Sequence, residues 1–243
     1  MQSTAMIDQN LRIARVTQPY LFQNSFILTD LPVKELLILQ ENAKPESRKR
    51  GDVLFRQGGY PKGAFWLLSG KAKIFQETPD GQRQTHYIYS NGDLIAYRQL
   101  IADEVHPVSA TLLEDATVGF ISTEIFRGLL NTSPFFARNI LTALAREFTV
   151  WMNRMTVFTQ FPVRSRLVLA LLILHEQYRL SGSPAGVITM TRSELAEYVG
   201  ASLETVVRVF NDLKNNKLVQ VHGRRILLPN PNGLLDILQK EEG

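Results

Sequence analysis

Cysteine is absent from the 243-residue chain. Its absence excludes disulfides, zinc–thiolate sites, thiol nucleophiles and iron–sulfur clusters held by cysteine. Long apolar runs are missing too, because no stretch reaches the roughly 18 residues of a membrane span. The N-terminus also lacks the continuous apolar segment of a signal peptide. We therefore expect a cytoplasmic protein with no membrane partner.

A large excess of charge of one sign is absent as well, since 27 lysines and arginines stand against 23 aspartates and glutamates. The net charge is +4 at pH 7, which is compatible with nucleic-acid binding but does not by itself indicate it. The signatures of common enzyme classes are missing, since the chain has no P-loop, no H-E-x-x-H and no G-x-S-x-G. We predict that the protein is not an enzyme. Its length allows one large or two modest domains.

Between about residues 50 and 120, short apolar runs alternate with turns that contain glycine. Turn signals stand at Asp80-Gly81 and at Asn91-Gly92. Several short strands at roughly 8–12-residue spacing predict a compact β domain, a sandwich or a barrel. The runs are VLFRQG, FWLLSG, KAKIFQ, THYIY and ATVGFI.

A long helix is predicted after Pro134. Its apolar residues stand alternately three and four apart, which is the spacing of a heptad seam. Such a narrow seam favours pairing with a second copy of the chain, and the alternative is packing on the chain's own β domain. Pro162 ends this helix, and SRLVLALLILHEQY forms the next. The seam residues are Leu141, Leu144, Phe148, Trp151, Met155 and Phe158.

Residues 192–211 carry the most specific pattern in the chain. Thr191 and Glu194 have the spacing of a capping box at the start of one helix. Gly200 supplies a left-handed turn position, and Ser202 caps a second helix. Caps, turn and apolar spacing together predict a helix-turn-helix, followed by a small hairpin around His222-Gly223. The predicted inward residues are Leu195, Ala196, Val199, Val206, Val209, Phe210 and Leu213.

The outer face of the second helix is predicted to enter a major groove of double-stranded DNA. Arginine can donate two hydrogen bonds to guanine and glutamate can accept one from cytosine, each contact being worth about 1–3 kcal/mol of discrimination. Glu204 and Arg208 suit these roles, although residues four apart also form solvated ion pairs worth about 0.2–0.5 kcal/mol. Flanking residues are expected at phosphates. The candidate DNA-binding residues are Thr191, Arg192, Ser193, Ser202, Leu203, Glu204, Thr205, Val207, Arg208, Arg224 and Arg225.

With these motifs the chain resembles the Crp/Fnr superfamily of bacterial transcription regulators. GDVLFRQGGYPKGAFWLLSGKAKIF resembles the start of its β-roll sensor, and LAEYVGASLETVVRVFNDLKNNKLV resembles its DNA-binding core. The resemblance implies an α+β chain with a cyclic-nucleotide-binding-like β-roll (jelly-roll), a dimerisation helix and a winged helix-turn-helix. It also implies a homodimer on a palindromic promoter, with RNA polymerase as a partner. The expected parts are a tail at 1–20, the sensor at 21–130, the helix at 131–160 and the DNA-binding domain at 161–243.

The resemblance also bears on the DNA sequence that is read. Glu204 and Arg208 match the family's base-reading glutamate and arginine. Leu203, however, stands where members that read a TGTGA-type half-site have another arginine. An apolar residue there is similar to the Fnr branch, and we predict a half-site with a TTG-type core.

An effector site is implied by the same resemblance. Members that bind cyclic AMP use a segment that begins Gly-Glu and ends Arg-Ser, and a polar pair on the dimer helix. Here Gly92-Asp93 matches the start, while His106-Pro107 replaces the end and Trp151-Met152 the helical pair. A buried cyclic phosphate without a positive partner is costly, so the sequence disfavours cyclic AMP. The candidate effector-binding residues are Gly92, Asp93, His106, Phe148 and Trp151.

The sequence leaves several alternative interpretations of the effector and of individual residues open. The identity of the effector is unknown, and some members sense gases through haem, for which His106 is the first candidate ligand. For each of the four histidines, His86, His106, His175 and His222, a surface or core role is favoured. Phe148 and Trp151 are favoured as seam residues and are also candidates to line a ligand pocket, and the two roles are compatible. An alternative function is a ligand-binding module that acts through protein contacts alone.

Overall fold

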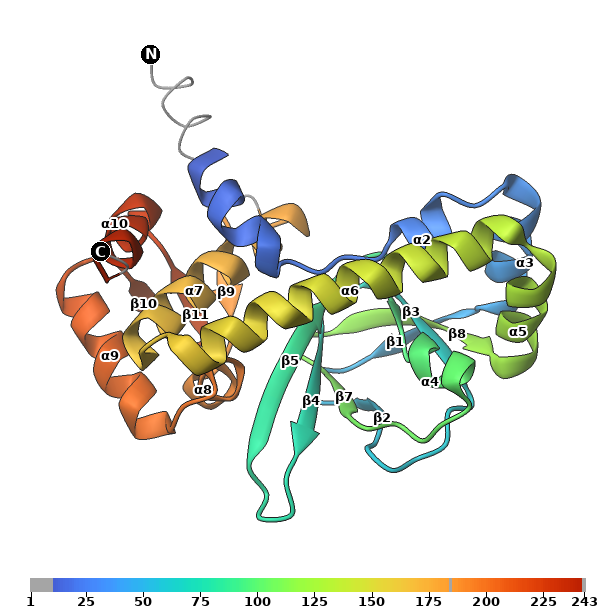
Figure 1. The fold of residues 1–243 in the computed structure, drawn as a ribbon, viewed down its shortest axis with the longest axis horizontal. Coiled ribbons are helices and arrows are strands. Elements are labelled where there is room, and N and C mark those ends of the chain that lie inside the picture. The colour runs from blue at the N-terminus through green and yellow to red at the C-terminus, as the bar shows by residue number, and fades with distance from the viewer. Residues whose placement is uncertain (1–10, 184, 242–243) are drawn as a thin grey trace. The chain divides into compact units, whose positions relative to one another are not determined.

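The structure, a computed structural model, describes residues 11–183 and 185–241 (Figure 1). It divides into two compact units. One comprises residues 22–148, and the other combines the described residues before 22 with those after 148. In the part of the chain that the structure describes, no helix is long and apolar enough to cross a membrane.

The first unit contains two four-stranded antiparallel sheets, with strand orders β1-β8-β3-β6 and β2-β7-β4-β5. All five runs predicted as strands form strands, and three short strands that the sequence did not reveal complete the sheets. The strands are β1 (Pro45–Arg48), β2 (Val53–Phe55), β3 (Gly63–Ser69), β4 (Ala72–Glu77), β5 (Arg83–Tyr89), β6 (Leu94–Ile95), β7 (Ser109–Leu112) and β8 (Ala116–Ser122).

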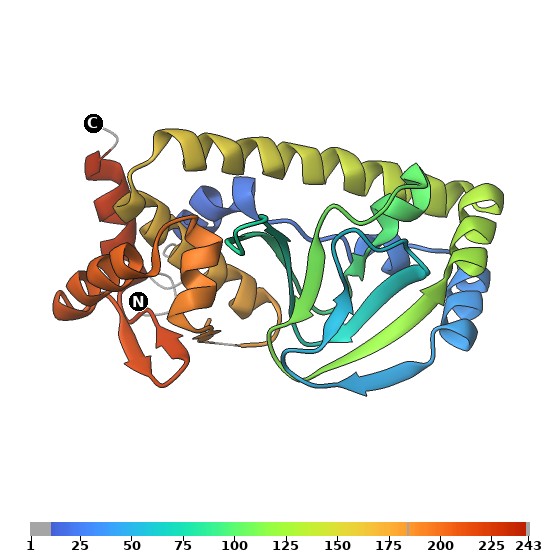
Figure 2. The same cartoon turned by 90° about the horizontal axis from the view of Figure 1, so that it is seen from below.

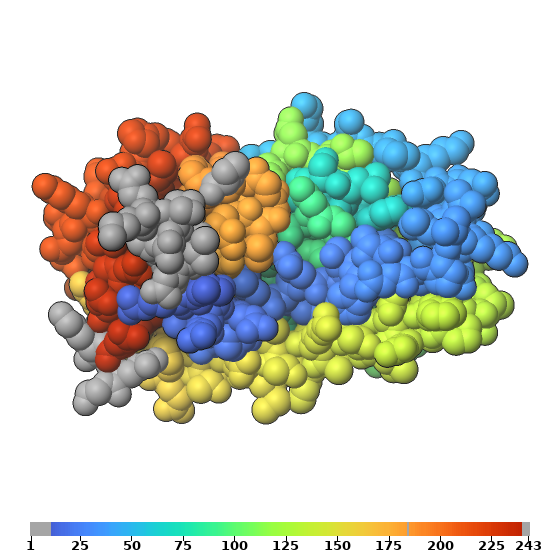
Figure 3. Space-filling model, turned by 90° about the horizontal axis from the view of Figure 1, so that it is seen from above, coloured from blue at the N-terminus to red at the C-terminus, as the bar shows by residue number. Residues whose placement is uncertain are grey.

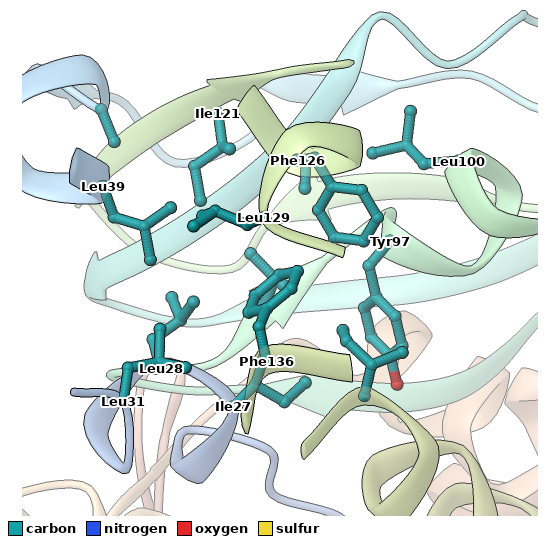
Figure 4. Close-up of a cluster of buried hydrophobic side chains, with 14 of the residues drawn as sticks. Ile27, Leu28, Leu31, Leu39, Tyr97, Leu100, Ile121, Phe126, Leu129 and Phe136 are labelled. Carbon is teal, nitrogen blue, oxygen red and sulfur yellow. The ribbon is translucent and has the colours of Figure 1, made fainter. Parts of the chain in front are cut away.

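Helices pack on the first of these sheets around one apolar cluster. Phe126 and Phe136 meet edge to face with ring centroids 5.3 Å apart, and Tyr97 and Ile121 lie in the same cluster (Figure 4). Aromatic pairs in this geometry stabilise a core beyond their buried area. The helices of this unit are α2 (Phe26–Thr29), α3 (Val33–Asn42), α4 (Tyr97–Ala102), α5 (Thr123–Thr132) and the first part of α6 (Pro134–Gln160).

Helix α6 has the extent that the sequence predicted after Pro134, and it continues into the second unit. In the space-filling view, atoms of α6, coloured yellow-green to yellow, reach the molecular surface (Figure 3).

The second unit is helical with one small sheet. Helix α7 is buried over most of its length and contacts α8, α9 and α10. The sheet has the order β10-β11-β9, and the hairpin β10–β11 extends from the helices of this unit (Figure 2). The elements are η1 (Gln18–Tyr20), α7 (Val163–Leu180), β9 (Ile188–Thr189), α8 (Arg192–Val199), α9 (Leu203–Asn215), β10 (Gln220–His222), β11 (Arg225–Leu227) and α10 (Pro231–Glu241).

Two details of this unit differ from the sequence-based expectation. The hairpin pairs His222 with Arg225, so its turn falls on Gly223 and Arg224, one residue later than expected. Residues 11–17 are helical, and Thr17 donates a hydrogen bond to Ile13 O at 2.9 Å. The N-terminal segment that the sequence suggested as a tail therefore includes ordered helical structure.

Candidate nucleic-acid interface and effector region

The first helix of the helix-turn-helix begins with the predicted capping box. Thr191 Oγ1 accepts a hydrogen bond from Glu194 N at 3.1 Å, and Glu194 Oε2 accepts one from Thr191 N at 2.7 Å. Helix α8 then ends at Gly200, whose φ of 68° lies in the left-handed region. Gly200 N donates to Ala196 O at 2.9 Å. Local sequence therefore determines both the start of α8 and the turn after it.

Helix α9 follows from an equally local signal. Ser202 Oγ accepts from Thr205 N at 3.2 Å and so caps the helix. Val206, Phe210 and Leu213 are buried, as predicted. Val209 is only half-buried, because it lies at the edge of the apolar face.

The predicted reading face of α9 points to solvent. Ser202, Leu203, Glu204 and Arg208 are exposed, while Thr205 and Val207 are half-buried. Among the described residues, neither Glu204 nor Arg208 has an ion-pair or hydrogen-bond partner for its side chain. The solvated ion pair considered from the sequence is therefore not formed. Both charged groups keep their hydrogen-bonding capacity for another molecule.

The flanking candidates fall into two groups. Ser193, Arg224 and Arg225 are exposed, and polar side chains at such positions suit contact with phosphates. Arg192, by contrast, lies over the ring of Phe210 at 3.7 Å, and burial lowers the pKa of its guanidinium. This stacking joins α8 to α9. Arg192 therefore has a packing role that the sequence did not indicate.

Arg166 of α7 is a positioning residue that sequence reasoning missed. Its guanidinium donates to Val199 O at 3.3 Å and to Gly200 O at 3.0 Å. These carbonyls lie at the C-terminal end of α8, where a positive charge is favourable. The contact spans 34 residues for Gly200, so no local pattern could have revealed it.

Gly92 and Asp93, proposed from the sequence as effector residues, have structural contacts. Asp93 Oδ1 accepts from Asn24 N at 2.7 Å, and Asp93 Oδ2 accepts from Ser90 N at 2.8 Å. Burial raises the pKa of this carboxyl to about 6. Gly92 has a φ of 89°, and a Cβ there would lie 2.8 Å from Ser25 Cβ. These contacts account for both residues without a ligand, and their use by an effector stays a prediction.

The only arginine between residues 92 and 115 is also engaged. Arg98 pairs with Glu147 of α6, with Nη1 and Oε1 3.0 Å apart. Tyr97 donates its hydroxyl to Glu147 Oε2 at 3.0 Å, and Tyr87 donates to Glu147 O at 3.2 Å. Burial raises the pKa of Glu147. The arginine therefore has a carboxylate partner within the chain and is not free for a phosphate.

The remaining effector candidates lie in different surroundings. His106 is buried and its ring stacks on Phe55 with centroids 4.1 Å apart. Phe148 and Trp151 are exposed on α6. Of the other histidines, His175 has its Nδ1 3.1 Å from Gly186 O, and His222 is exposed. The described residues contain no group of three or more histidine, aspartate or glutamate side chains placed to hold a metal ion.

The exposed face of α6 includes four of the six predicted seam residues and differs from the prediction at Leu144 and Phe158, which are half-buried. Leu144 packs partly against the core of the first unit, and Phe158 lines a small cavity of the second. Both were expected at a dimer interface. Met152, which was not, is 52% exposed. The large exposed apolar side chains of the helix after its first turn are Leu141, Phe148, Trp151, Met152 and Met155.

Two protein-family models match the chain, one in its N-terminal part and one in its C-terminal part. The cyclic nucleotide-binding domain matches residues 45–133, and the Crp-like helix-turn-helix domain matches residues 165–237. Among curated relatives, the transcriptional activator protein Anr of Pseudomonas protegens is 28% identical over 185 residues, 75% of each chain. The fumarate and nitrate reduction regulatory protein of Vibrio cholerae is 25% identical over 214 residues, 87% of this chain and 84% of that one.

Solved structures agree on the fold. The regulator CLP of Xanthomonas campestris superposes with a TM-score of 0.72 at 20% identity, over 82% of this chain and all of that one. FixK2 of Bradyrhizobium japonicum superposes with a TM-score of 0.70 at 20% identity, over 80% of this chain and 96% of that one. A β-roll joined to a winged helix-turn-helix with relatives of this kind defines a DNA-binding transcription regulator. The chain belongs to the Crp/Fnr superfamily.

Proposed function

We propose that this regulator binds a palindromic promoter site as a cytoplasmic homodimer and acts on RNA polymerase. The observation that carries base reading is the exposed face of α9, where Glu204 and Arg208 stand one turn apart without side-chain partners among the described residues. Capping and the Arg166 contact hold this helix and its turn in place. Little further ordering of the backbone is then needed when DNA binds.

The second copy is expected along the exposed face of α6. Leu141 is 67% and Phe148 is 62% exposed, and Met152 and Met155 continue the row at spacings of four and three residues. Large apolar side chains in such a row favour burial against a partner helix. An identical helix would supply the same row, as a two-fold interface requires.

Any effector is proposed to differ from cyclic AMP. Arg98 is paired with Glu147, and both oxygens of Asp93 accept backbone hydrogen bonds. A cyclic phosphate in this region would have to displace those contacts or remain without a positive partner, and both are costly. Haem on His106 stays a prediction from the family resemblance.

Base reading is tested by Arg208→Ala. We expect specific binding to weaken by about 1–3 kcal/mol while binding to random DNA changes little. Lys214→Ala, which removes one exposed positive charge from the other end of α9, is the matched control. It should affect specific and random DNA alike. Equal losses on both DNAs for Arg208→Ala would reject base readout.

The half-site is tested by selection from a random DNA pool. We expect palindromic sites with a TTG-type core, because Leu203 is exposed in the first turn of α9 and offers an apolar surface instead of a guanidinium. Enrichment of TGTGA half-sites would contradict this assignment. If no DNA is bound with a steep dependence on salt, the alternative of a module acting through protein contacts is favoured.

A further inference from the structure

A cavity of about 240 Å³ opens on the first unit, and its lining includes neither Asp93 nor Glu147 nor the residues that hydrogen-bond to them. Its walls include three phenylalanine rings, Phe55, Phe65 and Phe120. Phe65 lies 6.3 Å from Phe55 and 5.3 Å from Phe120 between ring centroids. The side chain of Phe120 is 41% exposed. The cavity therefore offers an apolar, aromatic surface that the described residues leave open.

His106 lines the cavity and carries a buried polar atom without a partner. The residue is 3% exposed, and its Nδ1 is buried without a hydrogen-bond partner. Its backbone is held on both sides, because His106 N donates to Gly59 O at 2.9 Å and Gly58 N donates to His106 O at 2.7 Å. A buried polar nitrogen without a partner is costly unless another molecule completes it.

Positive charge surrounds the same cavity. Arg56 and Lys62 line it, both are exposed, and their side chains have no partner within the described residues. The lining of the cavity contains no acidic residue. Burial lowers the pKa of His106, because it disfavours the charged form of the ring. An anion at the cavity mouth would therefore meet two cations and no opposing charge.

We propose that this cavity binds a small aromatic carboxylate of one or two rings. The ring of the ligand lies against the phenylalanines, its carboxylate pairs with Arg56 and Lys62, and a polar substituent reaches His106 Nδ1. Cavities that bury drug-sized molecules measure roughly 300–1,000 Å³, and this one is smaller. Its size suits benzoate or naphthoate and excludes a porphyrin.

The test uses the full-length protein without DNA, so its outcome is independent of the proposed DNA function. Titration calorimetry with benzoate, 4-hydroxybenzoate and 1-naphthoate should show saturable binding. Benzyl alcohol, which lacks the charge, and cyclohexanecarboxylate, which lacks the aromatic ring, should each bind more weakly. Absence of binding for all three aromatic carboxylates at millimolar concentration would overturn the proposal.

Two sets of variants locate the site. Arg56→Gln with Lys62→Gln should weaken binding of the aromatic carboxylates by about tenfold or more. The control Lys34→Gln with Lys44→Gln removes the same charge from exposed positions outside the lining and should leave affinity unchanged. Equal affinities for the two double variants would reject this cavity as the site.

His106→Phe separates a ligand-binding role from a structural one. It keeps the stack on Phe55 and removes the unpaired nitrogen, so we expect a higher midpoint of unfolding together with weaker binding of 4-hydroxybenzoate. A variant that keeps the affinity of the original protein would exclude His106 from the site. If the variant does not fold, the charge variants still decide the proposal.

Discussion

Asp93 provides a prediction whose size can be worked out from the structure. Its carboxylate is 1% exposed, and its charge is stabilised by neutral donors, namely backbone N–H groups such as those of Asn24 and Ser90 and the Ser90 side chain. Burial outweighs these hydrogen bonds and raises the pKa from 3.8 to about 6. At neutral pH the native protein therefore keeps a buried charge that the protonated form would not have.

The direction of the pH effect follows from proton binding. Between the unfolded pKa of 3.8 and the folded pKa of about 6, the native state binds more protons than the unfolded state. The stabilising contribution of this group is complete below the unfolded pKa and is lost as pH rises through the folded pKa. From pH 4 to pH 7 the loss is about 2–3 kcal/mol. Asp93→Asn removes the titration, so the variant should lack this decline.

The assay is urea unfolding of the original protein and of Asp93→Asn at several pH values from 4 to 7. The chain has two tryptophans, and a Trp151→Phe background leaves Trp66 as a fluorescent reporter of the first unit. The quantity to compare is the difference in the free energy of unfolding between the two proteins, because the contributions of all other titrating groups cancel in that difference. That difference should change by about 2–3 kcal/mol across the range. Parallel pH profiles would refute the assigned pKa and the burial argument behind it.

Two further predictions concern the turn and the dimer. Gly200→Ala should destabilise the protein by about 1–2 kcal/mol in thermal unfolding, because a Cβ is unfavourable at its φ of 68°. Gly128→Ala, in the middle of α5 with open space around it, should instead be neutral or stabilising. Phe148→Asp should convert a dimer into a monomer in sedimentation experiments. Phe135→Asp, which is also exposed but stands off the Leu141–Met155 row, should not, and equal effects of both would contradict the interface.

Much of the helix-turn-helix could be predicted because its signals are local. A capping box, a left-handed glycine and a serine cap each act within four residues, and all three are present where the sequence placed them. The strands separated by glycine-containing turns were predictable for the same reason. The short strands β1, β6 and β7 were not, because their residues become strands only when a partner strand lies beside them.

The spacing of apolar residues along α6 predicted a helix but did not predict which of its sides packs against the rest of the chain. Apolar residues occur on more than one side of this helix, and spacing alone did not tell which side the chain covers. Leu144 was expected at the interface and packs partly on the chain's own core, while Met152 stays exposed. Which side of the helix is covered depends on helices and strands that are distant in sequence. The spacing of apolar residues along α6 therefore could not predict it.

By itself, the sequence determined the two-part architecture and the face of α9 that stays exposed, because turns, caps and apolar spacing act over a few residues. Only the tertiary structure decided how Asp93, Arg98 and His106 are used. Desolvation and hydrogen bonding at each of these side chains depend on neighbours brought together from distant parts of the chain. The local sequence around each of these residues is therefore compatible with a ligand-binding role or with contacts inside the protein. The surrounding tertiary structure determines which of the two is realised.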